Sequence, residues 1–225
     1  MSNFILAGLF TEGTTDVRFL ESIVKKTLDE VAFECSGEIE TELEIININK
    51  TGLNFNQQVL EASKKASNDL GVLLLFVHTD ADGINDETIF RTKIIPAISF
   101  LNEQDDNLVC KNIVAIVPIQ MTESWMLADK ELLKSEIGIE GEDVDLGLLR
   151  NPEGIGNPKF VIENVIRLSK ENQTKRKRNR GLDISDLYQI IGHKIELSEL
   201  EKLTSYNKFK SSLRDMFKEL NFLHD

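Results

Sequence analysis

Three stretches of this chain are apolar at almost every position, and this pattern limits the fold more than any other feature of the sequence. They are FILAGLF at 4–10, VLLLFVHT at 72–79 and IVAIVPI at 113–119. Such continuous runs are typical of strands that are buried on both faces of a parallel sheet. A fourth stretch, ELEIINI at 42–48, is a further strand candidate. The pattern therefore predicts a mostly parallel, open sheet of about four strands.

Helical patterns alternate with these strands. The first begins near Thr14 or Thr15, which are candidate N-cap residues, and others cover 56–70 and 86–103. A fourth begins at MTESWMLADKELL, with Thr122 as a candidate cap. Strands that alternate with helices predict an α/β fold in which helices flank the sheet.

The character of the chain changes after residue 138. The segment GIEGEDVDLGLLRNPEGIGNPK is polar and rich in glycine, and it predicts a long loop. Three helical stretches are expected to follow, at 158–172, 183–191 and 197–222. We therefore expect an α/β domain over residues 1–138, and a loop with a helical C-terminal extension packed on it over residues 139–225.

The composition narrows the classes of protein to which the chain can belong. A net charge of −12 over 225 residues argues against broad nucleic-acid binding through many phosphate contacts. It leaves room for a nucleic-acid enzyme whose acids surround metal ions. No apolar run is long enough to span a bilayer, and the N-terminus lacks the features of a signal peptide. Cys35 and Cys110 are interpreted as free thiols, so we expect a cytoplasmic protein without membrane contact.

Carboxylates follow three of the strand candidates. Glu12 comes after the first, Asp80 and Asp82 close the third, and Glu123 follows the fourth. Ligands of open parallel sheets bind beyond the carboxyl ends of the strands. Crowded carboxylates repel one another, and a hard divalent cation such as Mg²⁺ or Mn²⁺ relieves that repulsion. We expect a metal site at this edge, and Asp16, one helical turn after Glu12, could face it too.

FTEGTTD at 10–16, followed by VHTDADG at 77–83, resembles the TOPRIM domain of topoisomerases, primases and OLD-type nucleases. MTESWMLAD at 121–129 and NPK at 157–159 are more narrowly similar to small stand-alone TOPRIM-like bacterial proteins. Such proteins are often encoded beside an ABC or AAA ATPase, in settings that suggest defence against phage. The resemblance covers residues 4–160. It implies an Mg²⁺-dependent endonuclease that cuts DNA or RNA with an ATPase as partner.

The resemblance also implies roles for single acids. Glu12 would be a metal ligand and a general acid or base, and Asp80 and Asp82 would be the ligands of the Asp-x-Asp motif. Asp16 would match the second acid of the OLD-type variant. Glu123 would be a further ligand or would support one.

The resemblance also bears on residues of the motifs that are not acids. Lys159 would stabilise negative charge on the phosphate in the transition state. His78 and Thr79 stand where TOPRIM proteins often carry more acids, which leaves the number of metal ions open. His78, His193 and His224 are too scattered to predict a zinc site, and they are interpreted as structural or surface histidines.

One segment, TKRKRNR at 174–180, is densely basic. Such a run is either a solvated loop or a contact to the backbone of DNA or RNA. The residues of this expected nucleic-acid contact are Lys175, Arg176, Lys177, Arg178 and Arg180.

Simpler readings of the acids stay open. Asp-Gly is a common turn dipeptide, so Asp80 and Asp82 could only shape a turn. Glu12, Asp16 and Glu123 lie near helix starts, where the helix dipole alone favours acidic residues. Lys159 could likewise be a solvated lysine at a helix start.

Two other functions compete with the nuclease. DADG after an apolar strand also resembles the Asp-x-Asp-Gly-Thr motif of haloacid-dehalogenase-like phosphatases, with Asp80 as nucleophile and Asp82 as acid. Against this reading, Ile84 replaces the threonine, and the motif follows the third strand instead of the first. The other alternative is a non-catalytic subunit that docks to an ATPase. The oligomeric state is left open by the sequence.

Overall fold

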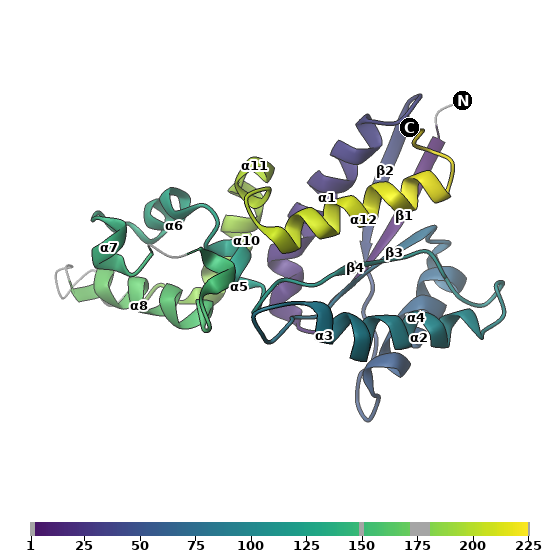
Figure 1. The fold of residues 1–225 in the computed structure, drawn as a ribbon, viewed down its shortest axis with the longest axis horizontal. Coiled ribbons are helices and arrows are strands. Elements are labelled where there is room, and N and C mark those ends of the chain that lie inside the picture. Colours follow the sequence, from purple (N-terminus) through teal and green to yellow (C-terminus); the bar gives the residue numbers. More distant parts are fainter. Residues whose placement is uncertain (1–2, 149–150, 172–180, 225) are drawn as a thin grey trace.

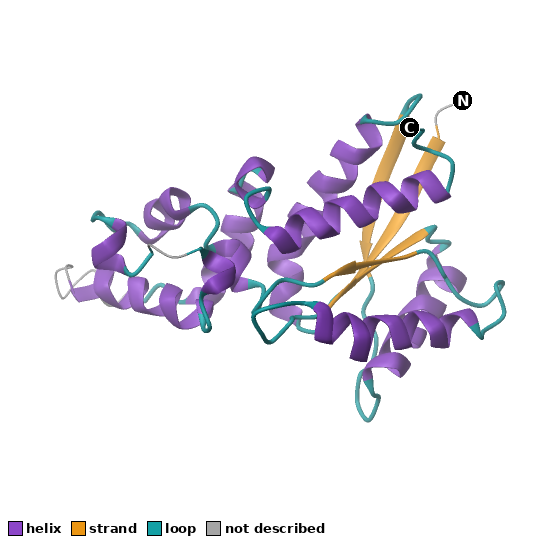
Figure 2. Ribbon diagram, viewed as in Figure 1, coloured by secondary structure: helices purple, strands orange, loops and turns teal. Residues whose placement is uncertain are grey.

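The computed structural model describes residues 3–148, 151–171 and 181–224. Within these residues, four parallel strands form one sheet in the order β2-β1-β3-β4. The strands are β1 (Asn3–Phe10), β2 (Ile39–Ile45), β3 (Leu74–His78) and β4 (Ile113–Ile116). Helices cover both faces of the sheet (Figure 1, Figure 2). The predicted α/β fold, with an open parallel sheet and C-terminal helices, is confirmed.

One face of the sheet is covered by α1 (Thr14–Phe33) and α12 (Thr204–Glu219), which lie side by side in Figure 1. The ring of Phe76 on β3 meets the ring of Phe209 on α12 edge-on, with centroids 5.8 Å apart. Both rings are buried in the core cluster that also holds the inner side of α1. Helix α12 therefore helps to cover this face of the sheet.

The opposite face is covered by two helical segments. The first is α2 (Phe55–Lys65), which continues into a π-helical turn at Ala66–Leu70. The second runs through α3 (Glu87–Ile89), a π-helical turn at Phe90–Ile94 and α4 (Ile95–Asn102). Their apolar side chains form a second core cluster with the facing side chains of β1 and β3. Both segments match the helices predicted from the sequence.

Strand β2 lies at an edge of the sheet, and it begins and ends three residues earlier than predicted. It pairs only with β1, from Asn3↔Ile39 to Leu9↔Ile45, so it ends where its partner ends. Its glutamates Glu40, Glu42 and Glu44 are exposed, and they alternate with half-buried residues. Charges along an open edge hinder pairing with another chain.

The remaining helices form a lobe beside the sheet, at the left of Figure 1. They are α5 (Glu123–Met126), α6 (Lys130–Ile137), α7 (Asp143–Leu146), the 3₁₀ turn η3 (Pro152–Gly154), α8 (Pro158–Glu171), α10 (Ile184–Lys194) and α11 (Leu197–Leu200). Their buried side chains belong to the same core cluster as the α1–α12 face of the sheet. Trp125 and Met126 are fully buried in it. No helix in the described parts of the chain combines the length and apolar character that crossing a bilayer requires.

Two predicted helices are interrupted, and the predicted loop is not fully irregular. The carboxylate of Asp129 accepts a hydrogen bond from the backbone N–H of Leu132 at 2.9 Å, which starts α6 as a separate helix. The carboxylate of Glu153 accepts hydrogen bonds from the backbone N–H groups of Thr204 and Ser205, at 2.9 and 2.7 Å. These bonds start α12 at Thr204, so the predicted helix over 197–222 divides into α11 and α12. The predicted loop itself contains α7 and η3.

Candidate functional site

The ends of β1 and β3 meet at one edge of the sheet. The strands pair in parallel up to Phe10↔Val77, so the residues that follow them leave the sheet side by side. The Oγ1 of Thr79 donates a hydrogen bond to Oε2 of Glu12 at 2.7 Å. The Nζ of Lys93 lies 3.5 Å from the same carboxylate oxygen and 3.0 Å from the Thr79 hydroxyl. These contacts join the Glu-Gly turn to the Asp-x-Asp segment. Lys93, which takes part in two of them, was not predicted from the sequence.

Asp80 is fixed by the segment that follows β4. Its Oδ1 accepts hydrogen bonds from the backbone N–H of Thr122 at 2.8 Å and from the Thr122 hydroxyl at 3.2 Å. Thr122 does occupy the N-cap position of α5, but its side chain makes no capping hydrogen bond. The hydroxyl that was predicted to cap a helix instead orients an acid of the neighbouring strand end.

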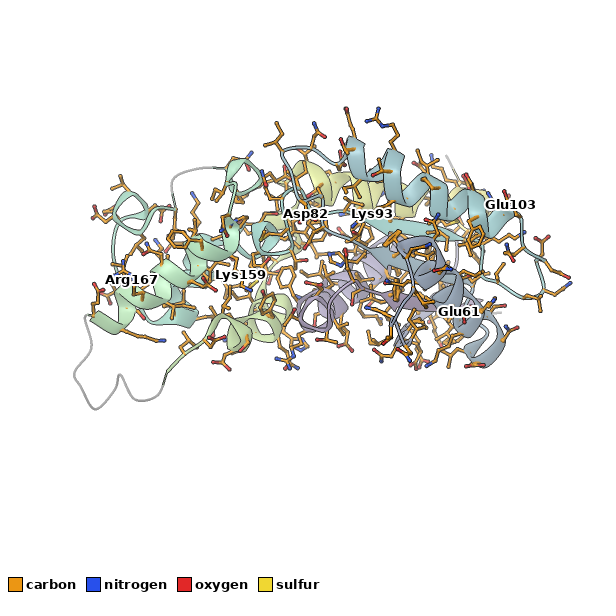
Figure 3. All side chains as sticks on the ribbon, turned by 90° about the horizontal axis from the view of Figure 1, so that it is seen from below. Glu61, Asp82, Lys93, Glu103, Lys159 and Arg167 are labelled. Carbon is orange, nitrogen blue, oxygen red and sulfur yellow. The ribbon has the colours of Figure 1, made fainter. Side chains whose placement is uncertain are left out.

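Asp82 is exposed and adopts a left-handed backbone conformation, with φ at +50°. Its backbone N–H donates to the carbonyl of Gln120 at 2.8 Å, which holds the turn against the segment after β4. The pKa of Asp82 is raised, first by partial desolvation and then by the negative charges of Asp80 and Glu12, while Lys93 opposes the shift. Three carboxylates therefore lie within one another's electrostatic field. Figure 3 shows Asp82 and Lys93 close together, with Lys159 on the other side of Asp82.

Asp16 lies at the start of α1, where it serves the helix terminus. Its Oδ2 accepts a hydrogen bond from the backbone N–H of Gly13 at 2.9 Å, and Gly13 is the N-cap residue. The prediction of Thr14 or Thr15 as the cap is therefore wrong, because Asp16 itself closes the first turn. The same Oδ2 lies 3.8 Å from Nδ1 of His78.

Glu123 points into the protein, where it contacts a residue of α10. The hydroxyl of Tyr188, on α10, donates a hydrogen bond to Oε1 of Glu123, and both side chains are buried. Burial raises the pKa of Glu123, and the charge of Asp80 adds to the shift, while Tyr188 and Lys159 oppose it. Burial also raises the pKa of Tyr188, and its hydrogen bond to Glu123 adds to that shift. The charge of Asp80 at the acidic edge therefore acts on the buried carboxyl group of Glu123.

Lys159 is exposed near the start of α8. That start is capped by Asn157, whose Oδ1 accepts a hydrogen bond from the N–H of Phe160 at 3.0 Å. Burial raises the pKa of Glu123, and the charge of Lys159 opposes that rise. The hydrogen bonds of Ser185 lower the pKa of Asp183, and Lys159 adds to that shift as a minor cause. The basic run with Lys175, Arg176, Lys177, Arg178 and Arg180 lies outside the described residues.

The acidic edge fits a hard divalent cation in chemistry. In the described ranges, no group of three or more histidine, cysteine, aspartate or glutamate side chains is close enough to enclose an ion. Mg²⁺ rarely needs such an enclosure. One or two carboxylates and the phosphate of the substrate usually bind it, and it keeps several water molecules. Glu12, Asp80 and Asp82 offer carboxylate oxygens, and a cation would relieve the repulsion that raises the pKa of Asp82.

The acidic edge is also open. A cavity of about 680 Å³ lies elsewhere, between α6, α7, η3 and α11, and is lined by residues such as Lys130, Asp143 and Leu203. Glu12 and Asp82 are instead exposed on the surface. An open edge can admit a long polymer, whereas small molecules are usually enclosed in a pocket.

Two residues of the site were not predicted from the sequence, and a third makes contacts other than the predicted ones. Lys93 and Tyr188 stand in helices far along the chain from the acids they contact, and nothing beside them in the sequence marks them. Thr122 lies at the predicted N-cap position, but its hydroxyl contacts Asp80 and His78 in place of the helix start. His78 is buried, which agrees with its interpretation as a structural histidine. His78 and Thr79 directly precede the Asp-x-Asp motif, and this adjacency is the sequence signal that indicates their place at the acidic edge.

Comparison of the chain with known protein families, curated proteins and solved structures gave no significant match. The likeness to the TOPRIM domain therefore rests on the motifs quoted above, and any function has to be argued from the chemistry of the edge.

Proposed function

We propose that this chain is a divalent-metal-dependent hydrolase that cuts phosphodiester bonds of DNA or RNA in the cytoplasm. The observation that supports this most is the hydrogen bond from Thr79 to Glu12, which ties the end of β1 to the segment that carries Asp80 and Asp82. Acids from two neighbouring strand ends thus share one open edge, where ligands of such sheets bind.

In this proposal, Glu12, Asp80 and Asp82 would hold Mg²⁺ or Mn²⁺. Asp16 and Glu123 would support these ligands. Asp16 closes the turn after Glu12, and Glu123 is held by Tyr188. When bound, the ion would polarise a phosphoryl oxygen and make its bound water more acidic.

The chain's own cations would bind the substrate. Lys93 contacts Glu12 on one side of Asp82, and Lys159 projects from α8 on the other side (Figure 3). Both ammonium groups can attract a phosphate, and charge that is fixed before the reaction stabilises the negative charge of the transition state. Thr79 and Thr122 would keep Glu12 and Asp80 in place.

The net charge of −12 also bears on the partner. A chain this acidic attracts nucleic acid weakly over most of its surface, so capture of the substrate would need local basic patches or a partner with a basic surface. An ATPase of the ABC or AAA type, the partner implied by the TOPRIM resemblance, would fill that role in defence against phage.

The test is a cleavage assay on plasmid, linear DNA and RNA with Mg²⁺ or Mn²⁺, with and without an ATPase encoded beside this chain. Asp80→Ala and Glu12→Ala are expected to abolish cutting while the fold is kept. Glu103→Ala is the matched control, because it removes the same charge from an exposed acid at the far end of the molecule (Figure 3). Cutting by both site variants, or cutting that survives a chelator, would refute the proposal.

Metal binding is measured separately by thermal unfolding. A ligand that binds only the folded chain stabilises it by about 2.7 kcal/mol at a hundred times its Kd. We expect Mn²⁺ to raise the Tm of the wild type and of Glu103→Ala, but not that of Asp80→Ala. Hydrolysis of a small phosphomonoester, together with a fluoride-trapped analogue of the aspartyl-phosphate intermediate on Asp80, would instead assign the edge to phosphatase chemistry.

A further inference from the structure

A fully buried histidine lies at the centre of the acidic edge. His78 is the last residue of β3, and its side chain has no exposed surface. Its Nε2 lies 3.1 Å from Oγ1 of Thr122 and 3.3 Å from Oδ1 of Asp80. Its Nδ1 faces Oδ2 of Asp16 at 3.8 Å. One imidazole ring thus stands between an acid of α1, an acid that follows β3 and the start of α5.

The hydrogen bonds indicate which ring nitrogen carries a proton. The hydroxyl of Thr122 donates to Oδ1 of Asp80, so its oxygen is left to accept from His78. We assign the N–H to Nε2, because Oδ1 of Asp80 can only accept, and from there the N–H can serve both Thr122 and Asp80. The oxygen Oδ1 of Asp80 is therefore surrounded by the N–H and the hydroxyl of Thr122 and by the imidazole N–H.

The other ring nitrogen has no partner. Among the described residues, Nδ1 of His78 is the buried side-chain polar atom that makes no hydrogen bond. Leaving a buried polar atom unpaired costs about 1–3 kcal/mol, and the other residues of β3 are apolar. A leucine or valine would fill this position without that cost, so packing alone does not account for a histidine here.

We propose that His78 is the positioning residue of the acidic edge. With Thr122 it holds Oδ1 of Asp80, so that Oδ2 of that carboxylate would be the oxygen offered to a metal ion. This inference rests on the proposed function, because it treats Asp80 as a metal ligand. Groups that orient a ligand from behind typically change metal affinity by about 10- to 100-fold when they are removed.

Two amide variants separate this role from simple packing. In His78→Gln the side-chain amide N–H₂ can reach the place of Nε2, whereas in His78→Asn the shorter side chain reaches only the place of Nδ1. We expect His78→Gln to keep the Mn²⁺ affinity of the wild type in calorimetry. We expect His78→Asn to weaken Mn²⁺ binding by about 10- to 100-fold. In crystal structures of the two variants, Asp80 should keep its contact to Thr122 in the first and turn away in the second.

Several outcomes would overturn the proposal. One is an unchanged Asp80 and unchanged Mn²⁺ affinity in His78→Asn, and another is an equal loss in both variants, which would indicate packing only. Should His78→Asn fail to fold, Thr122→Val and Thr122→Ser decide, because only valine lacks the hydroxyl that links His78 to Asp80. Equal Mn²⁺ affinity in those two variants would also contradict the role.

The proposed function can fail independently of this inference. If the wild type binds no Mn²⁺ and cuts nothing, the metal-dependent hydrolase is ruled out. The orientation of Asp80 in the two His78 crystal structures still decides whether His78 positions that carboxylate.

Discussion

The hydroxyl of Tyr188 donates a hydrogen bond to the buried carboxylate of Glu123 across 65 residues of sequence. Tyr188 belongs to α10 in the C-terminal lobe, and Glu123 opens α5 directly after the segment that fixes Asp80. The pKa of Tyr188 is raised by burial and by Glu123, and also by the charges of Asp16 and Asp80. This contact therefore links α10 to the start of α5, directly after the residue that holds Asp80.

Tyr188→Phe should destabilise the protein, because it leaves a buried carboxylate without its donor. A hydrogen bond to a charged group contributes about 1.5–3 kcal/mol, and that is the expected loss in the free energy of unfolding by urea. The pKa of Glu123 should rise further, since the Tyr188 bond holds it down.

The control for this variant is Tyr206→Phe. The hydroxyl of Tyr206 pairs with the uncharged Oγ1 of Thr27 at 2.9 Å, so its loss should cost less, about 1 kcal/mol. Equal costs in the two variants would contradict a charge-assisted bond between Tyr188 and Glu123.

Glu123→Gln should change how stability depends on pH. Burial raises the pKa of Glu123 in the folded protein above its ordinary value of 4.5, so folding shifts this group toward its neutral form. The stability linked to this group is present below pH 4.5 and is lost as pH rises through the folded-state pKa. Glutamine stays neutral, so the variant should gain stability relative to the wild type as pH rises.

Urea unfolding of both proteins at a series of pH values between 4 and 8 checks this, since titrations of all other groups cancel in the difference. A difference that does not change with pH, or that shrinks toward high pH, would show that burial does not raise the pKa of Glu123.

Lys93→Met should separate metal affinity from catalysis. Lys93 is a cation beside Glu12, so removing it should tighten Mn²⁺ binding by about 1 kcal/mol, or about fivefold, at a partly exposed site. The gain should shrink at high salt, which screens the charges. Cleavage should fall all the same, because the variant lacks an ammonium group for the phosphate.

Lys64→Met is the matched control for Lys93→Met. Lys64 pairs with Glu61 on the surface of α2 and contacts none of the acids of the edge. Calorimetry with Mn²⁺ and the cleavage assay should both leave this variant unchanged. Weaker Mn²⁺ binding in Lys93→Met would assign the lysine to holding Glu12 in place.

Glu153→Ala should loosen the start of α12. The Glu153 carboxylate is buried and accepts from the N–H groups of Thr204 and Ser205 and from the Ser205 hydroxyl at 2.6 Å. Loss of these bonds should lower the free energy of unfolding by about 2 kcal/mol. Glu140→Ala, which removes an exposed acid, should stay within about 0.5 kcal/mol of the wild type. Similar stability of the two variants would contradict a capping role for Glu153.

The sequence predicted the parts of the fold that depend on local pattern. Continuous apolar runs located β1, β3 and β4, because strands buried on both faces carry few polar side chains. The half-exposed edge strand β2 was misplaced by three residues, since the isoleucines after it extended the apolar pattern beyond its pairing with β1. The division between α11 and α12 depends on Glu153, which is distant in sequence, so no local pattern could reveal it.

The candidate site divides in the same way. Acids that directly follow a strand could be expected at its carboxyl edge, because the sheet fixes where they emerge. Lys93, Thr122 and Tyr188 act through contacts made only when separate helices pack together. Such partners carry no local sequence signal, and a single sequence cannot indicate them.

The position of α12 has a consequence for how the molecule is made. All four strands lie between residues 3 and 116, yet Phe209 of α12 packs on Phe76 of β3 in the shared core. A nascent chain on the ribosome would therefore expose the apolar face of its finished strands until the final long helix has been synthesised. We therefore expect chaperones to bind this chain most strongly during synthesis, after β4 has left the ribosome and before α12 is complete.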